Sequence, residues 1–402
     1  MPTRPTGTSV VRAINARGAF RLLLSQGPLS RPEIAAQLAV SKPTASHLLT
    51  QLQESGLVRS DGNRDGAIGR AAELFRVDGT VAHAAAVDVT PERIAAVVVD
   101  LTGARIGEFE LLTPEHGVPD PGAQLLAALR GACDGTSVAP EDLRRVVIGI
   151  QGAIDPTTER LRFAAHLPGW QDAALTPTLR EHLGVPFDIE NDVNLVAIAE
   201  HAHGAAVGND SFAVLWVSDG IGMGLMLGGR MLRGRTGGAG EIADLPVPGA
   251  PVAPEVDEHE ASGLQALAGA PALGEVLANH GFDAAAPVEA MAAAAASDAA
   301  GGATALDEVA RRLALGLSAV VAVVDPDLFV LAGDIALAGG ERLRGLVEHH
   351  LHAGVVARPP VLLSELPGNP VLDGAVRLAV TSVQEELLRT ISGGQPRAAT
   401  GD

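Results

Sequence analysis

The sequence predicts a winged helix-turn-helix (all-α with a small wing) joined to a two-lobed α/β domain. Residues 9–56 show helical patterns separated by short turns. From residue 82 several strands follow one another, then a helix, and then a buried strand that ends near residue 152. A second set of strands and helices starts at residue 211, which indicates two α/β lobes with a cleft between them. We therefore expect four parts: residues 1–80 form a DNA-binding head, 81–205 a first lobe, 206–390 a second lobe whose last helix returns to the first, and 391–402 a disordered tail.

Composition predicts a soluble, cytoplasmic protein. The chain is 47% hydrophobic and 19% charged, as globular proteins are. No apolar run reaches the roughly 18 residues that a membrane span requires, and the N-terminus lacks the apolar core of a signal peptide. Cys133 is the single cysteine, so neither an intramolecular disulfide nor a multi-cysteine zinc site can form within one chain.

The charge is distributed unevenly along the chain. Residues 1–80 hold 10 Lys and Arg against 6 Asp and Glu, a net charge of +4, while the rest holds 19 basic and 42 acidic residues, a net charge of −23. A protein with an overall charge of −19 should repel DNA, so the basic first fifth indicates a contact with nucleic acid. Chance fluctuation in a small window is the alternative explanation.

Capping signals place the helices of the head. A helical pattern covers residues 9–25, and Ser30 with Glu33 three residues later forms a capping box for the second helix. Ser41 caps the third helix, whose leucine stripe faces the core, and Gly56 ends it. A short turn joins the second and third helices, as in helix-turn-helix folds.

The third helix carries polar residues at its N-terminal end, which enters the major groove in such modules. Two strands follow, at 57–60 and 73–77, around a glycine-rich loop suited to a wing whose arginines contact the minor groove or the backbone. A helical bundle followed by a hairpin is the alternative. We predict that the partner is a double-stranded DNA operator, contacted by Ser41, Lys42, Thr44, Ser46, His47, Arg64 and Arg70.

Seven segments of the larger region carry a family resemblance. They are VIGIQGAID (147–155), LPGW (167–170), IENDVNLVAIAE (189–200), DGIGMGLMLGGRMLRG (219–234), GGAGEI (237–242), VDPDLFVLAGDIA (324–336) and NPVLDGA (369–375). In this order and spacing, the chain resembles the ROK family (repressors, open reading frames and kinases) over nearly its whole length. The resemblance implies an actin/hexokinase-like (RNase H-like) fold, a sugar held between the lobes, and assembly into dimers or tetramers. The head places the chain with the xylose-repressor-like branch.

The resemblance also implies which residues hold the sugar. In the family kinases, the aspartate of the NDxN motif acts as general base on a sugar hydroxyl, and Asp192 matches it. A carboxylate can also accept a hydrogen bond without catalysis, and Asp192 could serve as the N-cap of a helix over 192–204. We read Asp192 as a sugar ligand and predict no catalytic residue. The predicted ligand-binding residues are Asn191, Asp192, Glu241, Asp244 and Glu258.

Both phosphate-binding loops depart from the family pattern. Phosphoryl transfer needs glycine-rich turns whose N–H groups approach the nucleotide. The first loop of the family reads approximately D-x-G-G-T, but residues 88–93 are DVTPER, and Pro91 lacks an N–H donor. In the second loop, Asp219 precedes Gly220 where the kinases usually place threonine. One like-charge contact at 4 Å costs about 4 kcal/mol at an effective dielectric of about 20, so we expect ATP binding to be lost.

The zinc site of the family is also altered. Asp244 stands where the family usually has histidine, and residues 245–257 contain no cysteine, so a thiolate-rich tetrahedral site cannot be built. We therefore expect no metal and no cofactor. The sequence predicts a transcriptional regulator, most simply a repressor, that responds to a small sugar or sugar phosphate. An active ATP-dependent sugar kinase with an appended DNA-binding module, and a constitutive DNA binder with a vestigial pocket, are the alternatives.

Overall fold

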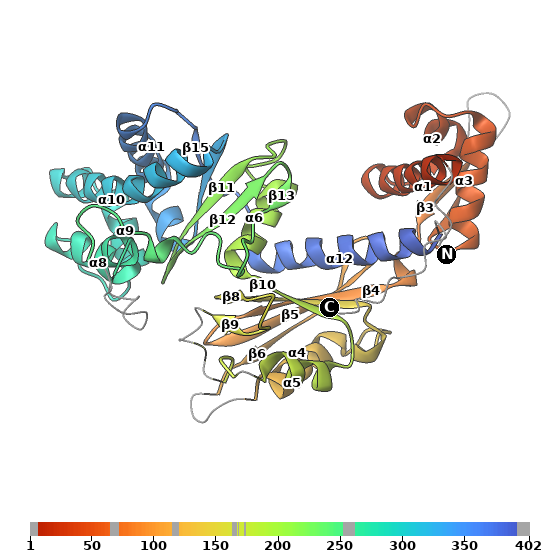
Figure 1. Cartoon of the computed structure of the whole chain (residues 1–402), viewed down its shortest axis with the longest axis horizontal. Helices are drawn as coiled ribbons and strands as arrows, with labels where there is room; N and C mark the ends of the chain where they lie inside the picture. Colours follow the sequence, from red (N-terminus) through yellow and green to blue (C-terminus); the bar gives the residue numbers. More distant parts are fainter. Residues whose placement is uncertain are drawn as a thin grey trace.

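Figure 1 shows a head and two α/β lobes, with the long helix α12 running from between the lobes toward the head. This computed structural model describes residues 7–64, 72–114, 120–162, 167, 169–172, 174–251 and 262–391. Within that part of the chain, no helix combines the length and the apolar character needed to cross a lipid bilayer.

The head is a winged helix, which confirms the predicted fold. Its three-stranded sheet has the order β1-β3-β2, and both strand pairs are antiparallel. The first strand is only two residues long and was not expected from the sequence, whereas the strand after the third helix extends further than expected. The elements are α1 (Gly7–Gln26), β1 (Leu29–Ser30), α2 (Arg31–Gln37), α3 (Lys42–Glu54), β2 (Val58–Arg64) and β3 (Ala72–Val77).

Both predicted helix caps of the head are confirmed. The backbone N–H and the hydroxyl of Ser30 each donate to the Glu33 carboxylate at 2.7 Å, which completes the capping box of α2. The Ser41 hydroxyl accepts the backbone N–H of Thr44 at 3.3 Å at the start of α3. After α3, Gly56 adopts φ +77°, a left-handed conformation that favours glycine.

The first lobe is built on a mixed five-stranded sheet of order β10-β7-β4-β5-β6. Strands β4, β7 and β10 are parallel, while β4, β5 and β6 form an antiparallel meander. One face packs against α4 and α5. The elements are β4 (His83–Val89), β5 (Arg93–Asp100), β6 (Arg105–Leu112), α4 (Pro121–Cys133), β7 (Arg145–Ile150), β8 (Ala153–Ile154), β9 (Leu161–Arg162), α5 (Leu175–Leu183) and β10 (Phe187–Asn191), with 3-10 turns η1 (Gly79–Val81) and η2 (Pro140–Asp142).

The second lobe has its own five-stranded sheet, of order β13-β12-β11-β14-β15. Its outer face is covered by helices α7 to α11, which share one hydrophobic core with it. The elements are β11 (Phe212–Val217), β12 (Ile221–Leu227), β13 (Arg230–Met231), η3 (Ile242–Asp244), α7 (Gln265–Ala268), α8 (Ala270–Asn279), α9 (Pro287–Ala296), α10 (Ala300–Val324), β14 (Leu328–Ala332), α11 (Asp334–Gly354) and β15 (Val361–Leu363).

Two helices fill the space between the sheets: α6 (Asp192–His203) and α12 (Pro370–Ile391). A single hydrophobic core joins them to the inner faces of both sheets and to the head. The helices cross so closely that a Cβ at Gly374 would collide with the carbonyl oxygen of Leu195. Glycine at 374 is therefore required for α12 to reach its position on α6.

The buried aromatic residue of α1 provides a test of the core that the head shares with the lobes. Phe20 is 1% exposed, so Phe20→Ala should lower the free energy of unfolding by about 3–5 kcal/mol, measured by urea denaturation followed by far-UV circular dichroism. Ile14, on the same helix, is 61% exposed, and Ile14→Ala should change the same quantity by no more than about 0.5 kcal/mol. Equal effects of the two substitutions would show that α1 does not pack as described.

Candidate functional site

The candidate ligand site is built at the carboxyl ends of the parallel strands of the first lobe. Asp88 in β4 pairs in register with Gly149 in β7, and Gly149 pairs with Glu190 in β10. Asn191 and Asp192 follow directly, where β10 ends and α6 begins. In open α/β sheets, this edge is where ligands bind.

Three carboxyl groups converge on the first turn of α6. Burial raises the pKa of Asp192 to about 7, and the negative charges of Asp88 and Glu241 add to that shift. Burial also raises the pKa of Asp88, although Asn369 donates to that carboxylate at 2.7 Å and Arg93 lies 3.7 Å from it. Because the charges of Asp88 and Glu241 act on Asp192, the three carboxyl groups lie near one another, and we call this cluster the interlobe site.

Glu241 reaches the interlobe site from the second lobe. It precedes the short 3-10 turn η3, and the backbone N–H of Met223 in β12 donates to the carbonyl of Gly240 at 3.0 Å. Gly240 adopts φ +97°, and a Cβ there would collide with the Met223 carbonyl oxygen, so only glycine brings the chain this close to β12. Burial raises the pKa of Glu241 to about 7, with a further contribution from the negative charge of Asp244.

The N-cap of α6 is Asn191 and not Asp192, so the capping role considered for Asp192 is wrong. The Asn191 side chain accepts the backbone N–H of Asn194 at 3.0 Å and donates to the carbonyl of Gly152 at 3.1 Å. Asp192 instead accepts the N–H of Val193 at 2.8 Å. Asn191 therefore holds the helix in place, and the Asp192 carboxyl faces the other acids.

One predicted ligand residue remains. Glu258 lies outside the described residues. Trp170, the last residue of the LPGW segment, is 2% exposed and packs in the first-lobe core that also contains residues of α5. Two surface cavities, of about 730 and 380 Å³, lie along the open edge of β10, and none of the predicted ligand residues lines either of them.

The turn between β4 and β5 replaces the first phosphate loop. The Thr90 N–H donates to the Arg93 carbonyl at 2.9 Å, and the Arg93 N–H donates to the Thr90 hydroxyl at 3.2 Å. Pro91 has no N–H, so only the N–H of Glu92 is left in this turn to meet a phosphate. The Arg93 guanidinium lies between two carboxylates, 3.7 Å from Asp88 and 3.5 Å from Glu110. The turn therefore offers little to a nucleotide.

The residues present do not fit the zinc site of the family. Asp244 occupies the histidine position, and Cys133, the single cysteine, is buried on α4 in the first lobe. Within the described ranges, no three His, Cys, Asp or Glu side chains gather closely enough to hold a metal ion. No step of the function is assigned to a metal.

Some of the predicted DNA-contacting side chains of the head are exposed, and others form hydrogen bonds within the head. Lys42 and His47 are exposed on α3, and Ser46 is half-buried beside them. The hydroxyls of Ser41 and Thr44 lie 2.8 Å apart and hydrogen-bond to each other, so both stabilise the start of the helix. Two further arginines were predicted: Arg64 donates to Glu33 at 2.8 Å, which ties the wing to α2, and Arg70 lies outside the described residues.

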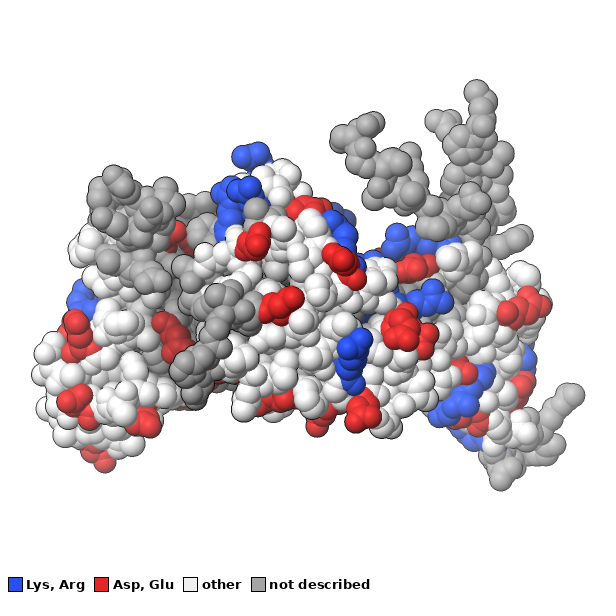
Figure 2. Space-filling model, turned by 90° about the horizontal axis from the view of Figure 1, so that it is seen from below, with Lys and Arg blue, Asp and Glu red and all other residues white. Residues whose placement is uncertain are grey.

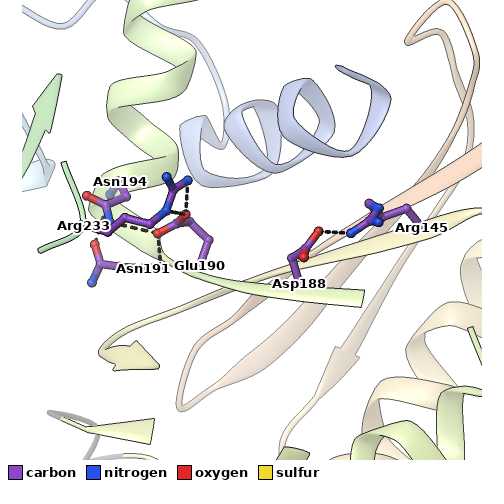
Figure 3. Close-up of polar contacts among 6 residues, drawn as sticks. All are labelled: Arg145, Asp188, Glu190, Asn191, Asn194 and Arg233. Atoms are coloured by element: carbon purple, nitrogen blue, oxygen red, sulfur yellow. Dashed lines mark hydrogen bonds and ion pairs between the residues drawn. The ribbon is translucent and has the colours of Figure 1, made fainter. Parts of the chain in front are cut away.

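Two functional candidates were missed by sequence reasoning. Glu190 is in the IEND motif but was passed over for the residues after it, and Arg233 is in the long glycine-rich segment of the second lobe. Figure 3 shows their ion pair close to Asn191, with a second pair, Arg145 and Asp188, further along β10. The carboxylate of Glu190, next to the predicted ligand residues, was the signal that the sequence offered. Its partner Arg233 is 43 residues away along the chain.

Surface charge on the lobes follows the composition. On the face drawn in Figure 2, acidic side chains are spread over both lobes and basic side chains lie among them. This distribution is in line with the net charge of −23 outside residues 1–80. It leaves the head as the better candidate for a contact with DNA.

The fold and the site together define the class: a helix-turn-helix head fused to an actin/hexokinase-like domain. The model of the ROK family matches residues 84–381, and that of the IclR helix-turn-helix domain matches residues 19–62. The chain belongs to the ROK family, as its seven sequence segments predicted.

Among curated relatives, the chain is similar to the DNA-binding transcriptional dual regulator NagC of Escherichia coli K12, at 25% identity over 238 residues. It is also similar to the xylose repressor of Bacillus subtilis 168, at 24% identity over 239 residues. Each match covers 59% of this chain but only 58% and 61% of the respective relative.

Two solved structures show the same fold. A ROK family transcriptional regulator, described as a homologue of the E. coli MLC protein, superposes with a TM-score of 0.75 at 18% identity, over 96% of this chain and 100% of that one. The ROK hexokinase of Thermus thermophilus superposes with a TM-score of 0.63 at 28% identity, over 75% of this chain and 99% of that one. The regulator matches the head as well as the lobes.

The interlobe carboxyls make stability depend on pH. In the folded protein the pKa values of Asp192 and Glu241 are about 7, against ordinary values of 3.8 and 4.5. The unfolded chain therefore releases these protons first, so their contribution is fully present below about pH 4 and is lost as the pH rises to about 7. The thermal midpoint should fall from pH 5 to pH 8 less steeply in Asp192→Asn/Glu241→Gln than in the unsubstituted protein.

The matched control is Asp219→Asn, which alters an exposed carboxylate on the turn between β11 and β12. Differential scanning fluorimetry at a series of pH values should give this variant the slope of the unsubstituted protein. A double variant with that same slope would contradict the assignment of raised pKa values to the interlobe site.

Proposed function

We propose that this chain is a sugar-responsive, DNA-binding transcriptional repressor whose ROK domain binds its effector without phosphorylating it. The observation that carries the proposal is one shared core: the head, both sheets, α6 and α12 are packed together, so a ligand between the lobes can act on the head. Curated relatives with this family domain are a transcriptional dual regulator and a xylose repressor.

The DNA-binding half of the proposal rests on the head. Helix α3 presents Lys42 and His47 to solvent at the end that enters the major groove in winged-helix modules. We propose that two heads of a dimer, or of a dimer within a tetramer, read the half-sites of a palindromic operator. Half-sites one helical turn, about 10 bp, apart would suit such a pair.

The effector-binding half rests on the interlobe site. Carboxyls with pKa values near 7, such as Asp192 and Glu241, both accept and donate hydrogen bonds at neutral pH, as the hydroxyls of a sugar require. A sugar or sugar phosphate fits this chemistry, and relatives are named for N-acetylglucosamine and for xylose.

The proposal that the effector is not phosphorylated rests on the β4–β5 turn. A kinase needs N–H donors and cations against the nucleotide phosphates, whereas this turn carries a proline and Glu92, and its arginine lies between Asp88 and Glu110. An active sugar kinase remains the rival because Asp192 matches the general base of the kinases and a ROK hexokinase shares the fold.

The DNA-binding role predicts a loss of affinity on neutralising the head. Lys42→Ala with Arg70→Ala should weaken operator binding about tenfold or more and reduce the slope of log K against log salt by about 1 to 2, since each phosphate contact contributes about 0.9. Fluorescence anisotropy over a KCl series measures both, with an operator selected from random duplexes. Arg230→Ala, an exposed charge on β13, is the control and should change neither quantity. An unchanged affinity in the head variant would argue against the assignment.

The effector role predicts sugar binding without turnover. One of glucose, xylose, N-acetylglucosamine, glucose 6-phosphate and N-acetylglucosamine 6-phosphate should raise the thermal midpoint and release the operator. Asp192→Asn should abolish both effects, while Asp219→Asn should retain them. A coupled ADP-release assay with Mg-ATP and the same sugars should show no turnover. Turnover that Asp192→Asn abolishes would establish the kinase instead. No stabilisation by any of these sugars would favour a constitutive DNA binder with a vestigial pocket.

A further inference from the structure

Glu190 and Arg233 form an ion pair between the two lobes. Glu190 is in β10 of the first lobe with a side chain 9% exposed, and both Nε and Nη2 of Arg233 lie 2.6 Å from its Oε2 atom. The other carboxylate oxygen accepts the backbone N–H of Asn191 at 3.1 Å and the side-chain amide of Asn194 at 2.9 Å. The carboxylate is thus fully occupied, and it joins the second lobe to the first turn of α6 (Figure 3).

Both ends of this pair are anchored beside the interlobe site. Glu190 directly precedes Asn191 and Asp192 in the chain. Arg233 begins a short segment of the second lobe that folds back on itself, because its carbonyl accepts the N–H of Ala239 at 3.1 Å, and this segment leads into Glu241. A movement between Glu190 and Arg233 would therefore change the separation of Asp192 and Glu241.

The interlobe site itself favours separation of the lobes. Asp88 and Asp192 are on the first lobe, Glu241 and Asp244 are on the second, and the charges of Asp88 and Glu241 act on Asp192. Carboxylates that share a site repel one another once they ionise. Glu190 and Arg233 oppose this repulsion, because their attraction draws the same two lobes together. A sugar that hydrogen-bonds to carboxyls on both sides would act in the same direction as the ion pair.

The pair also borders the helix that reaches the head. Arg233 is the one second-lobe residue among those that line the cavity of about 380 Å³, which is otherwise formed by β7, β10 and the C-terminal half of α12. That half of α12 includes Glu385, whose carboxylate lies 3.9 Å from the Arg21 guanidinium of α1. Figure 1 shows α12 extending from this region to the head.

We propose that the Glu190–Arg233 ion pair is a latch that holds the lobes in the effector-binding position, and that Arg233 is a positioning residue for the interlobe site. The inference rests on the proposed function, since it concerns the regulation of the same site. Effector and latch stabilise one arrangement of the lobes, and α12 transmits that arrangement to α1. Without the latch, the lobes separate more readily and more effector is needed to restore the arrangement.

The test measures effector binding and operator release in Arg233→Gln and Glu190→Gln, with the sugar that gives the unsubstituted protein its largest thermal shift. Each variant should raise the Kd for that sugar, and the sugar concentration for half-maximal operator release, about tenfold. The Kd for operator without sugar, and the response at saturating sugar, should stay within about threefold of the unsubstituted protein. Arg233→Lys, which keeps the charge but not the two-nitrogen contact, should give an intermediate Kd.

Two further variants separate a latch from a general structural effect. Arg145→Gln removes the neighbouring ion pair with Asp188, which lines the same cavity but lies within the first lobe, and it should leave the sugar Kd unchanged. The double variant Glu190→Gln/Arg233→Gln should be no weaker than either single variant, because both remove one interaction.

These experiments give one set of results if the latch is wrong and a different result if the proposed function is wrong. Multiplicative losses in the double variant, or an equal loss in Arg145→Gln, would overturn the latch. So would a sugar-responsive protein in which Arg233→Gln binds sugar as tightly as before. An unsubstituted protein that responds to no sugar would instead overturn the proposed function.

Discussion

The close crossing of α6 and α12 between two sheets is the constraint on which the rest of the structure depends. Gly374 lets the two helix backbones meet at Leu195, and Gly149 in β7 faces side chains of both helices. The first turn of α6 bears Asp192, and Asn369, just before α12, donates to Asp88 in β4. The same packing therefore fixes the interlobe carboxyls and the course of the helix that reaches the head. A bulkier residue at either glycine would displace both together.

Around the interlobe site, electrostatics favour a neutral, hydroxyl-rich ligand over a polyanion. The charge of Glu241 acts on Asp192, and Arg93, which lies 3.7 Å from Asp88, is shared with Glu110 at 3.5 Å. Burial of carboxyls costs free energy unless they are protonated or hydrogen-bonded, and sugar hydroxyls supply hydrogen bonds without adding charge. A triphosphate would add negative charge to this cluster and would find a β4–β5 turn whose N–H groups are mostly used. Under the proposed function, loss of nucleotide binding and retention of sugar binding are two expected consequences of one charge distribution.

Local signals made the helices of the head predictable, because caps and periodic patterns act over a few residues. Ser30 with Glu33, Ser41 and Gly56 each mark a boundary that the structure confirms. The two-residue β1 was missed because a strand this short has no periodicity and exists only through its pairing with β3.

The site was harder to predict because several of its contacts join residues far apart in the sequence. The side-chain amide of Asn191 also donates to the carbonyl of Gly152, 39 residues away, and the Glu190–Arg233 pair spans 43 residues. Contacts of this kind follow from the tertiary fold and leave no local pattern. The sequence identified the motif that contains these residues, but only the structure shows which residue caps the helix and which forms the ion pair.

The manner in which the head is joined to the lobes bears on how a ligand could act at a distance. A head on a flexible linker would be insensitive to the lobes, since a ligand shifts an equilibrium only through interactions that differ between its two states. Here Phe20, Leu23 and Leu52 of the head belong to the same buried core as Val380, Val383 and Leu388 of α12. Close-packed interiors respond to displacement by moving as bodies and not by deforming continuously. A change in lobe separation that shifts α12 must then either carry the head with it or break that core. Carrying the head keeps the apolar surface of that core buried and, in the proposed dimer, would change the spacing of the two heads.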